Sequence, residues 1–176
     1  DWLDAPPQAA IEHAEDLLGQ LGATGATARE MARYPLHPRL ARLMVEARRR
    51  GVAHEGATVA ALLSAGERLP QRVTHGSRSD LLVLLESEWS PYAERLVRQL
   101  MRQLVRQPGG GAVRGGVRNT ADEDALLISV LTAFPDRVAR RRLGADLQLA
   151  NGTSAQQAPN STVTGAEFLV AVEAED

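Results

Sequence analysis

The sequence contains no cysteine and no lysine, and aromatic residues account for only 3% of its 176 positions. Without cysteine, the chain can form neither a disulfide framework nor a thiolate zinc site. Without lysine, it cannot contain the phosphate-binding loop of nucleotide hydrolases, which requires that residue. Apolar residues still make up 44% of the chain, so the core must be built from leucine, valine and alanine. This composition favours helices.

No motif for a self-contained catalytic site is present either. The serine nucleophile elbow, G-x-S-x-G, does not occur. Glu86 and Glu88 are two positions apart in a predicted helix, so their carboxylates point to different faces. The histidines lack metal-ligand spacing and are interpreted as surface or capping residues: His13, His37, His54 and His75. We therefore predict no catalytic residue and no metal ligand in this chain.

No apolar run approaches the roughly 18 residues that a membrane-spanning helix needs. The N-terminal stretch, DWLDAPPQAA, lacks the basic start and apolar centre of a signal peptide. It also lacks an initiating methionine, which suggests a piece of a longer protein. Together with the absence of cysteine, these features predict a cytoplasmic protein without a membrane partner.

The charge is distributed unevenly. The formal net charge of −2 argues against a free-standing nucleic-acid binder, which is usually basic overall. Residues 1 to 28 contain five acids and no arginine, whereas residues 29 to 50 contain seven arginines. All 20 basic residues are arginine. This bias is explained either by a GC-rich genome or by selection for forked contacts with phosphate.

Hydrophobic periodicity predicts successive helices in the first 106 residues. Prolines and glycines mark the ends of these helices. The helices are expected before Gly22, over about 27 to 34, from Pro38 to about 50, over 57 to 65, and from Ser79 and from Pro91 onward. Thr27 and Glu30 have capping-box spacing. In the helix from Pro38, we expect an inward apolar stripe, with three residues facing away: Arg39, Arg42 and Glu46.

The second part of the chain changes character after residue 106. Residues 107 to 120 contain five glycines and a proline and are predicted to be a flexible linker. A helix is expected over about 123 to 141, with Pro135 kinking or splitting it. The stretch LQLAN then predicts a strand, NGTSAQQAPNS a polar loop, and EFLVAVEA a second strand.

Positive charge is concentrated at the expected end of that helix, at Arg137, Arg140, Arg141 and Arg142. One interpretation is a solvated helix C-terminus, where cations complement the helix dipole and Asp136 pairs with Arg140 at i,i+4. The other interpretation is contact with an anion, because arginine suits phosphate.

Four stretches resemble, in order, the C-terminal accessory region of bacterial DEAH-box ATP-dependent helicases of the HrpB type. The most specific is YPLHPRLARLMVEA at residues 34 to 47, which resembles the element that opens that family's helical ratchet. DWLDAPP with DLLGQLGA resembles the preceding winged-helix segment, and AALLS with SDLLVLLE resembles later ratchet helices. AFPDRVARRR followed by LQLANGTSA resembles the signatures at which an OB-like barrel begins.

The resemblance implies a mainly α fold with four parts. These are a winged-helix-like remnant (1–35), a ratchet-like helical domain (36–106), the glycine-rich linker (107–120), and a helix with a partial OB-like β segment (121–176). The wing is expected to be reduced, because GATGATAREMA is short and lacks the family's turn glycine.

In that family, the region closes a channel around single-stranded nucleic acid, usually RNA, and packs on motor domains of the same polypeptide. The motor domains, with their ATP and Mg²⁺, are absent from this chain, so it is expected to be a non-catalytic fragment of an NTP hydrolase that needs no cofactor itself. The resemblance implies nucleic-acid contacts at Arg137, Arg140, Arg141, Arg142, Arg39, Arg42 and Asn151. The alternatives are a non-enzymatic module that docks the motor or another protein, and a free-standing RNA binder, which the net charge disfavours.

Overall fold

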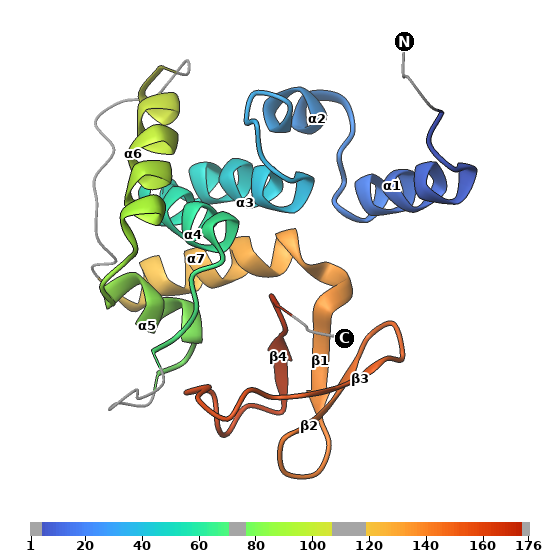
Figure 1. Cartoon of the computed structure of the whole chain (residues 1–176), viewed down its shortest axis with the longest axis vertical. Coiled ribbons are helices and arrows are strands. Elements are labelled where there is room, and N and C mark those ends of the chain that lie inside the picture. The colour runs from blue at the N-terminus through green and yellow to red at the C-terminus, as the bar shows by residue number, and fades with distance from the viewer. Residues whose placement is uncertain (1–4, 71–76, 107–118, 174–176) are drawn as a thin grey trace.

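The computed structural model describes residues 5–70, 77–106 and 119–173. Within these residues, seven α-helices precede a short 3₁₀ helix and a four-stranded antiparallel sheet (Figure 1). The helices are α1 (Gln8–Gln20), α2 (Gly25–Met31), α3 (Pro38–Arg49), α4 (Ala53–Ala65), α5 (Asp80–Glu86), α6 (Pro91–Arg106) and α7 (Thr120–Ala133). The 3₁₀ helix is η1 (Pro135–Arg137), and the strands are β1 (Val138–Arg141), β2 (Asp146–Leu149), β3 (Ser154–Gln156) and β4 (Phe168–Val170). The expected mainly α fold with a small β segment is confirmed.

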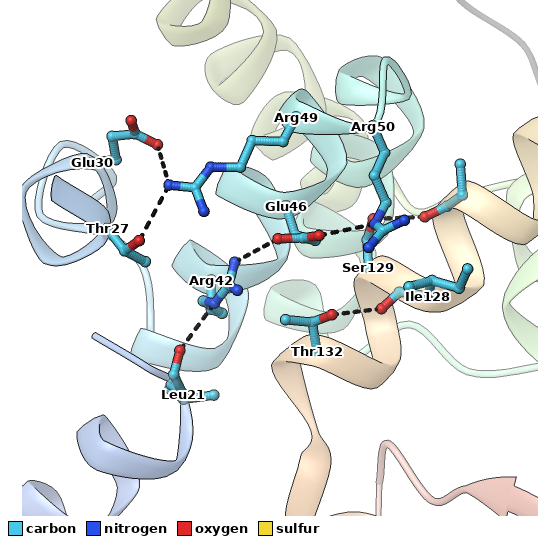
Figure 2. A network of polar contacts seen from close by, with 11 residues as sticks. Leu21, Thr27, Glu30, Arg42, Glu46, Arg49, Arg50, Ile128, Ser129 and Thr132 are labelled. Atoms are coloured by element: carbon cyan, nitrogen blue, oxygen red, sulfur yellow. Dashed lines mark hydrogen bonds and ion pairs between the residues drawn. The ribbon is translucent and has the colours of Figure 1, made fainter. Parts of the chain in front are cut away.

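The helix boundaries follow the prolines and glycines closely. Helix α1 starts directly after Pro7; Gly22 lies in the turn that follows it and Gly25 is the first residue of α2, and both glycines have positive φ. The predicted capping box is wrong, because α2 begins at Gly25 with Thr24 as its N-cap and no side-chain cap bond. Thr27 and Glu30 instead both accept hydrogen bonds from Arg49 of α3 (Figure 2).

The helical core is centred on α3 and α4, with α6 packed on α4 and α7 packed on α3 (Figure 1). The predicted apolar stripe of α3 is buried as expected: Leu40, Leu43, Met44 and Ala47. Helix α4 starts at Ala53, four residues earlier than predicted, and every residue from Glu55 to Leu62 is buried. Gly56 lies against Ala47 so closely that a Cβ at position 56 would collide with the Ala47 Cβ. The glycine therefore allows α3 and α4 to approach each other.

The expectation of a helix reaching residue 141 is wrong. Helix α7 ends at Ala133, and Phe134 leaves the helical region with φ −132° and ψ 50°. Proline lacks an N–H and disfavours helical geometry in the residue before it, so Pro135 ends the helix rather than bending it. After the single turn of η1, the chain becomes strand β1, with Ala139 fully buried and Arg140 exposed. Of the cluster, Arg140 and Arg141 are therefore on strand β1, Arg137 is in η1, and Arg142 directly follows the strand, so the cluster is not at the C-terminus of an α-helix.

The sheet has the order β3-β2-β1-β4, with every neighbouring pair antiparallel. Ala139, Leu147 and Leu149 form a small core on one face, and Ala155 and Leu169 pack against it. The strands predicted at LQLAN and EFLVAVEA are confirmed, although each is short. Strand β3 was expected to be loop, because its three residues, SAQ, are too few and too polar to show a strand pattern.

Two sets of hydrogen bonds hold the loop between β3 and β4 against the helices. Asp80, the first residue of α5, accepts bonds from the Ser161 hydroxyl at 2.7 Å and from the Thr162 amide at 2.7 Å. The Asn160 amide group donates to the carbonyl oxygens of Leu69 and Pro70. These contacts fix the sheet below α7 (Figure 1).

Most of the predicted linker lies outside the described residues, and its last two positions, Asn119 and Thr120, are the N-cap and first residue of α7. Asn119 Oδ1 accepts a bond from the Asp122 amide, so a capping side chain starts this helix. No helix among the described residues has the length and apolar character to cross a membrane.

Candidate nucleic-acid interface

The arginines that end the α7–η1–β1 segment face different directions. Side chains alternate between the two faces of a strand, so Arg140 and Arg141 point to opposite sides of the sheet. Arg140 lies opposite Gln148 of β2 and Phe168 of β4 on the open face. Arg141 lies opposite Leu147, on the face that carries the small apolar core. The cluster in the sequence therefore does not form one continuous cationic surface.

Arg141 connects the sheet to its neighbouring loops. Its guanidinium donates to three backbone carbonyl oxygens, those of Ala166 at 3.0 Å, Gly144 at 3.2 Å and Val163 at 2.9 Å. A guanidinium can satisfy several acceptors at once because it presents five donors in a fixed plane. This pattern gives Arg141 a structural role, because few of its donors remain for an anion.

Arg140 and Arg142 are exposed on the open side of the sheet. Arg140 pairs with Glu167 at 3.0 Å, and both side chains are more than half exposed, at 58% and 62%. An ion pair this exposed to water contributes little to stability and exchanges readily. Arg142 donates from Nε to Gln148 Oε1 at 3.0 Å. Both guanidiniums are therefore within reach of a ligand on this face.

Arg39 and Asp136 form an ion pair with two parallel hydrogen bonds next to the cluster. Arg39 Nη1 and Nη2 donate to Asp136 Oδ1 and Oδ2 at 2.5 and 2.8 Å, and Arg39 Nη1 also donates to the Ala133 carbonyl at 3.3 Å. The hydrogen bonds from Arg39 outweigh partial burial and lower the pKa of Asp136 below its usual value. The expected Asp136–Arg140 pair is wrong, because each residue has another partner. Arg39 does not face away into solvent either.

A pocket of about 380 Å³ brings Arg39 and Arg137 together with His37. Its apolar walls include Leu40 and Phe134, and the Arg39 guanidinium lies 5.4 Å from the centre of the Phe134 ring. Arg137 Nη1 donates to the Val172 carbonyl at 3.1 Å. Burial, with Arg39 and Arg137 nearby, lowers the pKa of His37. The sequence predicts only a surface or capping role for His37. The nearby prolines, Pro35 and Pro38, were the sequence feature that could have drawn attention to this position.

His37 does act as a cap, as expected, because its Nδ1 accepts a bond from the Arg39 amide at 3.3 Å. This contact starts α3 and directs the ring toward the pocket, so one side chain has both roles. The pocket lies where the start of α3 meets η1 and the end of the described chain. Glu173 is the acid in its lining.

Arg42 lies elsewhere on α3, in a separate polar network (Figure 2). Its Nε donates to the Leu21 carbonyl at 2.9 Å and its Nη1 to Glu46 at 3.0 Å, and Arg50 also pairs with Glu46. Burial alone would raise the pKa of Glu46, but the two guanidiniums lower it below its usual value. Arg42 and Glu46 are partly buried, so the expectation that they face away is wrong.

Asn151 is an exposed residue in the turn between β2 and β3. Its Oδ1 accepts a bond from the Thr153 amide at 3.0 Å, which leaves the side-chain NH₂ group available to a ligand. The structure therefore brings Arg39 together with Arg137 in the pocket, and Arg140 together with Arg142 on the open face of the sheet. Arg42, Arg141 and Asn151 lie in other surroundings.

No group of three or more histidines and acids is placed to hold a metal ion in the part of the chain that the structure describes. Asp136, whose pKa is lowered, is held by an arginine and is not paired with another acid. The predictions of no catalytic residue and no metal ligand stay predictions, because the described residues are only part of the chain.

The chain is similar in sequence and in fold to part of known helicases. No family model matches the chain, but solved structures do, and two of them are of HrpB from Escherichia coli, titled a DExH-box NTPase and a DEAH/RHA helicase. The chain is 34% and 31% identical to them, with TM-scores of 0.69 and 0.70 over 97% and 96% of its length.

Among curated proteins, the chain is 34% identical to the ATP-dependent RNA helicase HrpB of E. coli K12 over 97% of its own length. It spans only 20% of that relative. The resemblance to HrpB-type helicases is therefore confirmed, and the chain matches a fragment of such a protein.

Proposed function

We propose that this chain is an accessory region of an ATP-dependent RNA helicase and helps to form the path of a single strand of nucleic acid. In this proposal, ATP and Mg²⁺ bind to motor domains elsewhere in the same polypeptide. The whole protein is located in the cytoplasm. The chain itself holds the nucleic-acid strand and does not hydrolyse ATP. RNA is the expected strand, because the HrpB of E. coli that the chain matches is named an RNA helicase.

The observation that carries the proposal is the grouping of cations where the helices meet the sheet. Arg137 lines the pocket at this junction, and β1 continues directly from η1 to the exposed Arg140. A strand that is gripped without regard to sequence needs positive groups along its phosphates and no reading of base edges. A set of cations on two adjoining elements meets this need.

The proposal is tested by the salt dependence of RNA binding in the full-length protein. Arg137→Gln removes a charge but keeps a donor for the Val172 carbonyl. If Arg137 neutralises one phosphate, the slope of log K against log[salt] becomes shallower by about 0.7. Arg98→Gln is a matched control, because Arg98 is an exposed arginine on α6, at the opposite side of the helices from the sheet (Figure 1).

We expect Arg137→Gln to reduce RNA-stimulated ATP hydrolysis and Arg98→Gln to leave it unchanged. If both variants changed the slope of log K against log[salt] equally, the proposal would be contradicted. Such a result would mean that arginines anywhere on the surface contribute to RNA binding.

A second function is docking on another protein or on the motor itself, and α1 favours it. None of the residues of α1 is buried, and its apolar residues Ile11 and Leu18 are exposed at 37% and 38%. Under this alternative, Leu18→Asp would weaken docking on the other protein or on the motor, while RNA binding by the full-length protein would stay the same. Under the first function alone, Leu18→Asp would have no effect on either property.

A further inference from the structure

The open face of the sheet carries an aligned row of side chains that crosses all four strands. The register places Phe168 of β4 opposite Arg140 of β1, Arg140 opposite Gln148 of β2, and Gln148 opposite Ser154 of β3. Residues directly opposite each other in an antiparallel sheet project to the same side. The other side is occupied by the small apolar core, so this row is the outward surface.

Phe168 is the unusual member of this row. Its side chain is exposed at 59%, in a protein with only two phenylalanines. The other phenylalanine, Phe134, is buried at 5% in the helical core. A large apolar ring on an open face lacks the stabilisation that burial of apolar surface provides. Within the part of the chain that the structure describes, Phe168 does not belong to either hydrophobic core.

Arg140 is next to the ring, and Gln148 follows on the far side of Arg140 in the same row. The Arg140 guanidinium lies 5.8 Å from the centre of the Phe168 ring, and Glu167 holds it there through Nε at 3.1 Å. Gln148 accepts bonds from Arg142 at its Oε1 and keeps its NH₂ group available. An aromatic ring with a neighbouring cation is the combination that holds an unpaired nucleobase and its phosphate.

We propose that Phe168 and Arg140 form a stacking site for one unpaired base of a single-stranded nucleic acid. The base lies on the part of the ring that Arg140 leaves uncovered. Its phosphate replaces Glu167 as the partner of Arg140, at low cost because the present ion pair is exposed to water. This inference rests on the proposed function and adds to it a contact with a base. The pocket with Arg137, in contrast, offers contacts only to the phosphate backbone of the nucleic acid.

The test measures binding of the full-length protein to two labelled RNAs, a single-stranded oligonucleotide and the same backbone with abasic positions. Stacking on an aromatic side chain contributes about 1–3 kcal/mol per base by alanine substitution, which is a loss of about fivefold or more. Phe168→Ala should weaken binding of the intact RNA at least fivefold and change binding of the abasic RNA less than twofold. Phe168→Trp should retain affinity for the intact RNA.

Tyr92→Ala is the matched control. Tyr92 is also exposed, at 52%, and has Arg95 5.8 Å from its ring, but it is on helix α6 and not on the sheet. It should leave the binding of both RNAs unchanged. An unchanged melting temperature for Phe168→Ala, expected for an exposed ring, shows that any loss of binding is not a loss of folding.

The outcomes separate this inference from the function on which it rests. If Phe168→Ala has no effect, or weakens both RNAs equally, the stacking site is overturned while the channel proposal stands. An equal loss on both RNAs would point to Phe168 as a structural or protein-docking residue. If the wild-type protein binds neither RNA at low salt, both proposals fail.

Discussion

Arg39 and Asp136, 97 positions apart in the sequence, are joined by two parallel hydrogen bonds between a guanidinium and a carboxylate. Arg39 is in the first turn of α3, within YPLHPRLARLMVEA, and Asp136 is in η1, within AFPDRVARRR. These are two of the stretches that carry the resemblance to HrpB-type helicases. The pair gives a physical reason for their occurrence together, because each motif supplies one half of the joint between the helices and the sheet.

Asp136→Asn is predicted to destabilise the protein by about 2 kcal/mol, because it leaves Arg39 without its charged partner in a largely desolvated position. The two side chains are only 12% and 26% exposed, which is why solvent does not compensate for the loss. Urea denaturation of both proteins measures the difference. Asp124→Asn is the control, because its pair with Arg78 is more than half exposed on both sides, and it should change stability little. Equal destabilisation by the two variants would contradict this account.

The same pair predicts a dependence of stability on pH. The pKa of Asp136 is lowered in the folded protein, so the folded state binds a proton less readily than the unfolded state. The contribution of this carboxylate is therefore fully present above the unfolded pKa, near 3.9, and is lost as the pH falls through the folded value. The difference in unfolding free energy between wild type and Asp136→Asn should be constant above about pH 5 and shrink toward zero in stronger acid. A difference that grew on acidification would show the opposite sign.

Arg141→Lys is predicted to lower stability by about 2 kcal/mol although it conserves charge. A lysine ammonium cannot hold three carbonyl oxygens in the planar arrangement that the Arg141 guanidinium satisfies, and hydrogen bonds to charged groups are worth about 1.5–3 kcal/mol. Arg142→Lys on the exposed face is the comparison and should be nearly neutral. Thermal unfolding separates the two variants. A neutral Arg141→Lys would mean that the guanidinium is available for a ligand after all.

The sequence was sufficient for the helices because their signals are local. Apolar spacing and punctuation by proline and glycine identify α1, α3 and α6 without any long-range information. Strand β1 was read as helix, because VARR has no pattern of its own and is a strand only through pairing with β2 and β4. The partners of Arg39 and Arg141 could not be predicted for the same reason, since they depend on segments that are distant in the chain.

In the candidate site too, the sequence predicts individual residues from local motifs but not the contacts between distant segments. The motif YPLHPRLAR identified Arg39, and AFPDRVARRR identified Arg137 and Arg140, but neither stretch indicated that His37 would share a pocket with Arg39 and Arg137. The exposure of Phe168 is not predicted by the sequence either, because the sequence places this residue in an apolar strand, where burial is the usual expectation. Only the register, which aligns it with Arg140, shows that it is on the open face.

Gly56→Ala is predicted to destabilise the protein by about 1–3 kcal/mol, against the usual benefit of alanine in a helix. The added methyl group would collide with the Ala47 Cβ and force α3 and α4 apart at the centre of the core. Gly19→Ala in α1 is the matched control, because no neighbouring atom lies within 4 Å of its Cβ position. It should raise stability by up to about 1 kcal/mol, since alanine only reduces the freedom of the unfolded chain there. Opposite signs for one substitution at two helical glycines, measured by urea denaturation, would show that close helix packing sets the requirement at position 56. The same sign at both positions would mean that the core relaxes around the added methyl group.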